Sequence, residues 1–179
     1  MYKPRGKKVP PLSKNNIRKF AAKLRVADAE KGGQATGRLD VLGLLELRLP
    51  EIVEDFHFEI VEDSFLDVLA LTRPDQWHMQ VRQSVYDSAM ADDGRHRFTL
   101  AHEVGHLFLH QGAEAYARRA SYTQTHKAYE DSEWQADYFA AELLMPYEEV
   151  KAYLDVYDIA EDFGVSLQAA EIRMRNVKK

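Results

Sequence analysis

The chain has 179 residues, of which 45% are hydrophobic and 30% charged, as expected for one soluble domain with a hydrophobic core. It has no cysteine, which excludes disulfide bonds and thiolate metal sites, so any metal must be held by histidine and carboxylate side chains. The N-terminus has no apolar signal region and the chain has no run of about 18 apolar residues, so we expect a cytoplasmic protein without membrane contact.

The net charge of −5 is unevenly distributed. Residues 1–25 carry nine lysine and arginine side chains and no acidic one, so residues 26–179 hold 15 basic against 29 acidic side chains. Prolines among the charges of residues 1–12 predict a basic, flexible N-terminal arm. We expect this arm to be solvated or to pack on the acidic body of the protein, and contact with nucleic acid is the alternative.

The segment after the arm predicts two helices. Ser13 is a suitable N-cap for a helix that extends to about Asp28. The apolar face of this helix has helical spacing and consists of Ile17, Phe20, Ala21 and Leu24. After a glycine pair, a second helix is predicted over residues 39–47, with Pro50 as its stop.

Three stretches rich in β-branched and aromatic residues follow, at residues 56–61, 65–71 and 77–85. The second is ended by a proline, and the third alternates between apolar and polar side chains. Together they predict a small antiparallel three-stranded sheet.

Two apolar helices and a polar connection occupy the second half of the chain. The first helix is predicted over residues 95–111, and its composition indicates a buried central position. The polar stretch 114–129 is long for a structureless connection, which predicts a flap or a substrate-contacting loop. A second helix begins at Asp131 or Ser132 and ends before Pro146, and further helices complete the chain. The predicted fold class is α+β, mostly helical, with the central helix packed on the sheet.

The central helix contains the sequence HEVGH at residues 102–106, in which two imidazoles lie one helical turn apart on the same face. Both rings can then bind one metal ion while Glu103 faces a water bound to it, the arrangement of a zinc peptidase. The alternative is a helix whose histidines lie at the edge of the core. The small residues Ala101 and Gly105 allow a neighbouring element to approach closely.

A catalytic zinc usually has three protein ligands, and His110 cannot be the third, because it lies about 12 Å along the helix from His102 while each ligand is about 2 Å from the metal. Gly112 occupies the position of the third metzincin histidine, which excludes that class. Glu133, at the start of the next apolar helix, is the best candidate, although the helix dipole also favours an acidic residue there. Asp137 is an alternative ligand, or an acceptor for a ligand histidine. Weaker candidates are Glu130, Asp131 and His126.

Two segments resemble the signature of the ImmA/IrrE family of zinc metallopeptidases. The first is FTLAHEVGHLFLH at residues 98–110, and the second is EWQADYFAAELLMP at residues 133–146. The resemblance extends more loosely over residues 13–176. It implies that Glu133 is the third zinc ligand. The chain departs from the family's pattern at Asp137, where asparagine is common.

The resemblance also implies an organisation and an activity. The arm of residues 1–12 is expected to precede a minimal gluzincin-like metallopeptidase domain at 13–146 and a helical C-terminal subdomain at 147–179 that packs on it. The implied activity is that of a regulatory endopeptidase, which cleaves or acts on a helix-turn-helix repressor or antitoxin. Members of the family are often paired with such a regulator in toxin–antitoxin-like operons.

The expected site holds one Zn²⁺ per chain through His102, His106 and Glu133, with Glu103 as the general base. Other side chains are expected either to orient a ligand or to stabilise the transition state. These are Asp137, His110, Tyr122, His126 and Tyr129.

Two other functional classes remain open. A non-proteolytic regulator would use zinc structurally while it binds a partner. Such a protein would be expected to lack the general base, whereas this chain has Glu103. A DNA-binding regulator is suggested by the helix-turn-helix rhythm of residues 159–170. The acidic side chains of its first helix would repel phosphate, and the family commonly has a structural helical pair here, so direct nucleic-acid binding is not expected.

Overall fold

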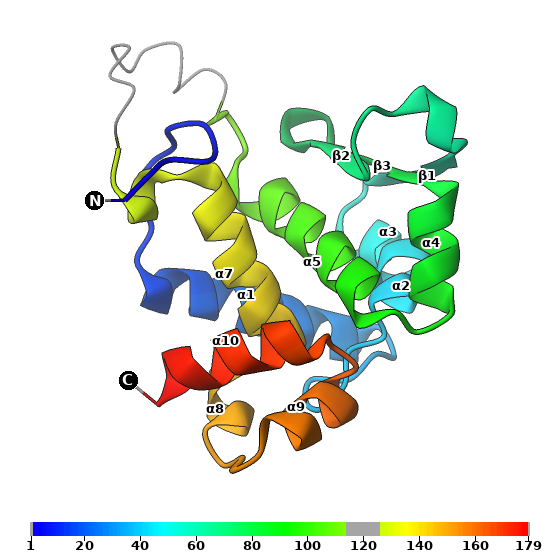
Figure 1. Cartoon of the computed structure of the whole chain (residues 1–179). Helices are drawn as coiled ribbons and strands as arrows, with labels where there is room; N and C mark the ends of the chain where they lie inside the picture. Colours follow the sequence, from blue (N-terminus) through cyan, green and yellow to red (C-terminus); the bar gives the residue numbers. More distant parts are fainter. Residues whose placement is uncertain (1, 114–125, 179) are drawn as a thin grey trace.

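The computed structural model describes residues 2–113 and 126–178, which form a mostly helical α+β fold, as predicted (Figure 1). Helix α5 (Gly94–Leu109) runs through the middle of the molecule, between a small sheet and helix α7 (Ser132–Leu144). Helix α1 (Lys14–Glu30) packs on α7. The C-terminal helices are α8 (Tyr147–Val150), α9 (Val156–Phe163) and α10 (Leu167–Val177).

Helix α1 begins where its sequence predicts. The side chain of Ser13 accepts a hydrogen bond from the backbone N–H of Asn16 and so satisfies one free donor of the first turn. Ile17, Ala21 and Leu24 are buried, whereas Phe20, predicted on the same face, is 43% exposed. Helix α1 therefore covers α7 with a narrower apolar face than the spacing predicted.

The second predicted helix does not stop at Pro50. It consists of α2 (Val41–Gly43), a π-helical turn η1 (Leu44–Arg48) and α3 (Leu49–Ile52). In the π-turn the N–H of Leu49 bonds to the carbonyl of Leu44, and a new first turn begins after it. Pro50 lies in that first turn, where a missing N–H costs no hydrogen bond, so the helix continues.

The sheet contains three strands, as predicted, but it is mixed rather than wholly antiparallel. Its strands are β1 (His57–Val61), β2 (Ala70–Arg73) and β3 (His78–Arg82), in the order β1-β3-β2. β2 and β3 pair antiparallel, whereas β1 and β3 are parallel. Strand β3 carries the fully buried Met79 and Val81, so it takes the central position, and the more exposed β1 lies at an edge.

Short elements connect the strands to one another and to α5. Two 3₁₀ turns, η2 (Asp63–Phe65) and η3 (Pro74–Gln76), lie between the strands. A third 3₁₀ turn, η4 (Ala128–Glu130), comes later in the chain and precedes α7. Helix α4 (Gln83–Met90) replaces the end of the third predicted strand. The side chain of Asp93 accepts hydrogen bonds from the N–H groups of Arg95 and His96, and this cap sets the start of α5.

The basic N-terminal segment is docked on the body of the protein rather than solvated, which was one of the two expected arrangements. Val9 is fully buried, and its N–H bonds to the carbonyl of Glu130. The N–H of Leu12 bonds to the carbonyl of Tyr129, and Lys8 forms a β-bridge with Asp131. The segment therefore runs beside the start of α7 (dark blue in Figure 1).

A buried ion pair holds the C-terminal helices on the body. Arg173 of α10 donates two hydrogen bonds to the carboxylate of Glu142 on α7, at 3.0 and 2.7 Å, and both side chains are 1% exposed. Arg173 also donates to the carbonyl of Met145. It is therefore unavailable to DNA phosphates, which supports a structural role for the helical pair α9–α10. No helix in the described ranges is both long and apolar enough to span a membrane.

We expect Arg173→Met to lower the free energy of unfolding by about 3 kcal/mol, because it leaves the Glu142 carboxylate buried with one remaining cation, Arg18, at 3.3 Å. Urea unfolding measures this loss. Arg175→Met, at an exposed position of the same helix, is the matched control and should change stability by less than about 0.5 kcal/mol. Equal stability of the two variants would contradict a structural role for the pair.

Candidate metal centre

Three side chains from two helices converge at the centre of the molecule. His102 and His106 lie one turn apart on α5, and Glu133 lies in the first turn of α7. The two Nε2 atoms are 3.0 Å apart. Each lies 3.3 Å from a different oxygen of the Glu133 carboxylate. Among the described residues, these three form the group whose donor atoms are close enough to hold a metal ion.

The donor set fits a tetrahedral metal. Ligand atoms about 2.0–2.1 Å from zinc at tetrahedral angles lie about 3.3 Å from one another. The two Nε2 atoms are separated by 3.0 Å, near this value, and each lies 3.3 Å from one of the two oxygens of Glu133. Two imidazole nitrogens and a carboxylate oxygen are also the donors that zinc accepts when no thiolate is present. The three residues can therefore hold a metal and leave a fourth position for water.

His102 is oriented by a carboxylate. Its Nδ1 lies 2.8 Å from Oδ1 of Asp137, one turn further along α7 than Glu133. Arg5 of the N-terminal segment binds the other oxygen of Asp137, at 2.5 Å. This arrangement leaves Nε2 of His102 facing the metal position. Asp137 thus contacts His102 and lies outside the group of three residues that could hold a metal ion.

The charges of these groups depend on one another. Burial opposes the charge of His102, but hydrogen bonds to Asp137 and Glu133 raise its pKa to about 9. Hydrogen bonds from both ligand histidines lower the pKa of the Glu133 carboxyl. Burial opposes ionisation of Asp137, but His102 and Arg5 hold its pKa below the usual value. Both carboxylates are therefore ionised at neutral pH.

His106 is oriented by a second histidine. Its Nδ1 lies 2.8 Å from Nδ1 of His110, which is 4% exposed and whose Nε2 lies 3.2 Å from the side-chain oxygen of Gln135. Burial is the main cause that lowers the pKa of His110 to about 4. His110 is therefore neutral at pH 7 and touches the side of the His106 ring that faces away from the metal position.

The crossing of α5 and α7 is close because both helices carry small residues there. Gly105 faces Ala136, and a Cβ atom on Gly105 would lie only 3.0 Å from the Cα and 3.1 Å from the carbonyl oxygen of Ala136. The prediction from the small residues of the central helix is thus confirmed at Gly105. The short distance between the helices brings Glu133 within reach of both imidazoles.

Asp131 fixes the start of α7 and hence the position of Glu133. Its Oδ1 accepts hydrogen bonds from the N–H groups of Glu133 and Trp134, as an N-cap does. Its Oδ2 accepts from the backbone N–H groups of Arg5 and Gly6 and lies 3.0 Å from Nε2 of His126. This fully buried carboxylate therefore joins the N-terminal segment to the ligand-bearing turn.

The ligands open onto a cleft of about 760 Å³. The residues that line it include His102, His106, Glu133 and Glu103. One wall is β2 with the turn that follows it, residues 68–76, and the opposite wall is the N-terminal segment, residues 5–9. A polypeptide can therefore reach the metal position between an edge strand and the N-terminal segment.

The remaining predicted side chains lie elsewhere. His126 turns toward Asp131, and Tyr129 is 41% exposed with Lys127 over its ring; neither lines the cleft. Tyr122, and most of the predicted flap, lie outside the described residues. Sequence reasoning missed Gln135 and Arg5. A polar residue within the apolar run of α7 was the available signal for Gln135, whereas nothing local marked Arg5.

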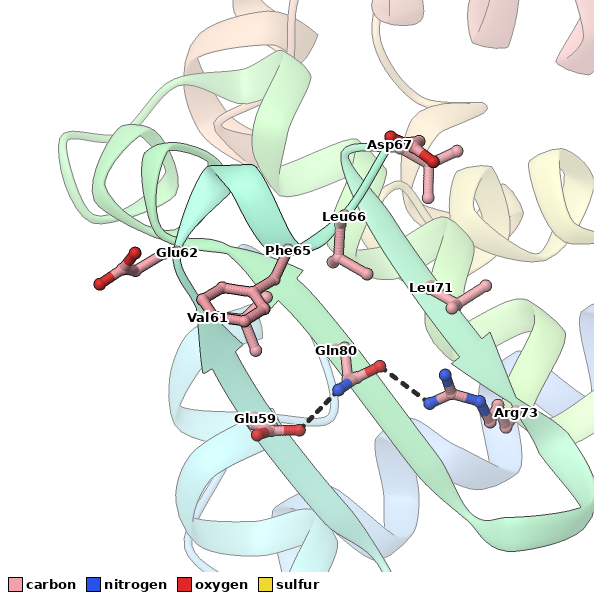
Figure 2. A pocket seen from close by; sticks show the side chains of 10 residues that line it. Glu59, Val61, Glu62, Phe65, Leu66, Asp67, Leu71, Arg73 and Gln80 are labelled. Carbon is pink, nitrogen blue, oxygen red and sulfur yellow. Dashed lines mark hydrogen bonds between the residues drawn. The ribbon is translucent and has the colours of Figure 1, made fainter.

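A second hollow, of about 640 Å³, lies on the outer face of the sheet (Figure 2). Gln80 of β3 spans it, donating to Glu59 of β1 at 2.7 Å and accepting from Arg73 of β2 at 2.8 Å. Phe65, which is 75% exposed, covers one end. Among the described residues, this face contributes no member to the metal-binding group.

Comparison with known proteins agrees with the geometry. The family model described as IrrE N-terminal-like domain, of the peptidase M78 type, matches residues 68–175, which include both ligand-bearing helices. A solved structure described as a Mycobacterium tuberculosis transcriptional regulator is similar with a TM-score of 0.56 and 17% identity, which shows a shared fold. The match covers 89% of this chain and 56% of that one, so this chain spans little more than half its length. No curated protein matches the chain.

We expect the wild-type protein to bind one divalent metal ion per chain and Glu133→Gln to lose most of this binding, because a neutral amide is a poor replacement for a carboxylate ligand. Metal content after dialysis, measured by mass spectrometry, checks this. Glu130→Gln removes a carboxylate three residues away that is outside the donor group, and should retain the metal. Loss of metal from both variants to the same extent would contradict the role of Glu133.

Gly105→Ala tests the close crossing. In an isolated helix this change would stabilise by about 1 kcal/mol. Here the added methyl meets the backbone of Ala136, so we expect a loss of about 1–3 kcal/mol and weaker metal binding. Thermal unfolding and chelator competition measure the two effects. A variant more stable than wild type, with unchanged metal affinity, would show that the crossing is not tight.

Proposed function

The chain belongs to the IrrE N-terminal-like family of peptidase M78 type, and on this premise we propose that it is a zinc-dependent endopeptidase. The observation that carries the proposal is the arrangement of His102, His106 and Glu133 as one donor set, in a cleft that Glu103 also lines. Three ligands with an open fourth position are typical of catalytic rather than structural zinc sites.

In this proposal the side chains divide the chemical work. Zinc, when bound, lowers the pKa of a coordinated water to about 7 and polarises the scissile carbonyl. Glu103 accepts the proton of the attacking water on its carboxylate and delivers it to the nitrogen of the leaving amine. Asp137 and His110 keep the imidazoles of His102 and His106 in position throughout.

The edge of β2 supports binding of an extended polypeptide. Leu69 accepts a hydrogen bond from Arg82, so residues 69, 71 and 73 direct their backbone groups toward β3. Ala70 and Thr72 then direct theirs away from β3, and both line the cleft. A substrate strand can pair with these groups and pass over the metal position. Thr72 also anchors the strand to α5 through a hydrogen bond to the carbonyl of Glu103.

For the substrate we propose a helix-turn-helix transcriptional regulator or antitoxin, in the cytoplasm. The support is the family membership, with its implied regulatory role. The similar solved structure, which is described as a transcriptional regulator, is consistent with action in gene regulation. Cleavage, rather than binding alone, is proposed because Glu103 is present beside the ligands.

We expect Glu103→Gln to reduce cleavage by at least about 100-fold while zinc content stays at one per chain, because the variant keeps the ligands and loses the base. The probe is a proteome-derived peptide library, in which mass spectrometry counts new termini. Removal of zinc by a chelator should abolish wild-type cleavage, and added zinc should restore it.

Two outcomes would contradict the proposal. Equal cleavage by zinc-loaded wild type and Glu103→Gln would exclude Glu103 as the base. A zinc-loaded wild type that cleaves neither the library nor a co-encoded helix-turn-helix regulator, but binds that regulator, would favour the non-proteolytic role.

A further inference from the structure

A chain of hydrogen bonds connects His106 to the N-terminal segment through the interior of the protein. It runs from Nδ1 of His106 to Nδ1 of His110, at 2.8 Å, and from Nε2 of His110 to the side-chain oxygen of Gln135, at 3.2 Å. The side-chain nitrogen of Gln135 then donates to the carbonyls of Pro10, at 2.9 Å, and Tyr129, at 2.8 Å. Gln135 is fully buried, so solvent does not replace any of these partners.

The two carbonyl acceptors, at Pro10 and Tyr129, determine where the hydrogens lie in this series of hydrogen bonds. Carbonyl oxygens accept and do not donate, so the atom of Gln135 that faces Pro10 and Tyr129 must be the amide nitrogen. The amide oxygen therefore faces His110 and requires a proton on Nε2 of that ring. The 2.8 Å separation of the two Nδ1 atoms leaves room for one hydrogen, and in the His110 tautomer protonated at Nε2 that hydrogen belongs to His106, whose Nδ1–H donates to Nδ1 of His110. Nε2 of His106 is left with its lone pair, directed at the metal position.

We propose that Gln135 is a positioning residue of the metal centre. It selects the tautomer of His110, and through it holds His106 with Nε2 directed at the metal, while it ties this arrangement to the N-terminal segment. The inference rests on the proposed zinc site and adds to it a residue two positions from Glu133 on the same helix. Glu133 faces the metal, and Gln135 supports the other side of the His106 ring.

The two ligand histidines are thus held by different kinds of contact, and both sets of contacts lead to the N-terminal segment. His102 depends on the charged Asp137, whose side chain is 37% exposed and paired with Arg5. His106 depends on neutral groups that are wholly or almost wholly buried. A surface ion pair is screened by solvent, whereas a buried acceptor left without its donor costs about 1–3 kcal/mol. We therefore expect removal of the Gln135 amide to disturb its histidine more than removal of the Arg5–Asp137 ion pair disturbs His102.

The test compares Gln135→Met, which keeps side-chain length and removes the amide, with Ser132→Ala. Ser132 also ties the N-terminal segment to α7, by accepting from the N–H of Lys7 at 3.0 Å, but it does not touch His110. We expect Gln135→Met to weaken zinc binding by about 10–100-fold and Ser132→Ala to leave it within about twofold. Chelator competition measures the zinc dissociation constants, and thermal unfolding of the metal-free proteins measures any general loss of stability.

A spectroscopic readout separates positioning from folding. Nitrogen-15 NMR of the metal-free wild type should show His110 as the tautomer protonated at Nε2, and Gln135→Met should lose this preference. In a His110→Asn background, where Asn retains an acceptor near the former Nδ1, Gln135→Met should no longer change zinc affinity.

A wild-type His110 protonated at Nδ1 would overturn the inference, as would zinc affinity of Gln135→Met within about twofold of wild type. A wild type that binds no zinc would instead overturn the proposed function, and the tautomer of His110 would still decide the inference.

Discussion

The metal centre depends on one close contact, the crossing of α5 and α7 at Gly105 and Ala136. Ligands on a common ion lie about 3.3 Å apart, and this crossing brings the carboxylate of Glu133 within 3.3 Å of both imidazoles of α5. With a separation of 3.0 Å between the position of a Cβ on Gly105 and Cα of Ala136, there is no room for a larger residue at the crossing. The same contact brings Asp137 to His102 and Gln135 to His110, so the ligands and their supports share one geometric requirement.

The N-terminal segment supplies hydrogen-bond partners that the two crossing helices lack. A pair of crossing helices leaves the first turn of α7 with free backbone donors and leaves the outer side of Asp137 open to solvent. Residues 5–12 fill this side: Arg5 binds Asp137, and Pro10 accepts from Gln135. Gly6 is required here, because a Cβ at that position would meet Ser132 at 2.3 Å. Arg5, one of the basic side chains of the segment, therefore serves a local contact with an acidic side chain of the candidate centre.

The grouping of His102, His106 and Glu133 could be predicted from sequence because helical periodicity places the two histidines together and because an apolar helix with an acidic start must pack nearby. The resemblance to a known family then selected Glu133 from several acidic candidates. The strand order could not be predicted, because the alternation within each strand does not say which strand is central. The passage of a helix through Pro50 depends on a π-turn, which has no simple sequence signal. Arg5 and Pro10 act more than 120 residues away along the chain, beyond any local pattern.

Hydrogen bonds connect one wall of the cleft to the candidate metal centre. The wall opposite β2 consists of residues 5–9, and this segment is bonded to the carboxylates of Asp131 and Asp137. A polypeptide lying along the edge of β2 touches a wall whose other side fixes the start of α7, and hence Glu133. Displacement of this wall therefore acts on Glu133 through Asp131 and on His102 through Arg5 and Asp137. Because Asp131 is fully buried and accepts from five donors, separation of the wall leaves a carboxylate short of partners, which opposes that displacement. The docked segment thus keeps the ligands in place while the cleft remains open to a substrate.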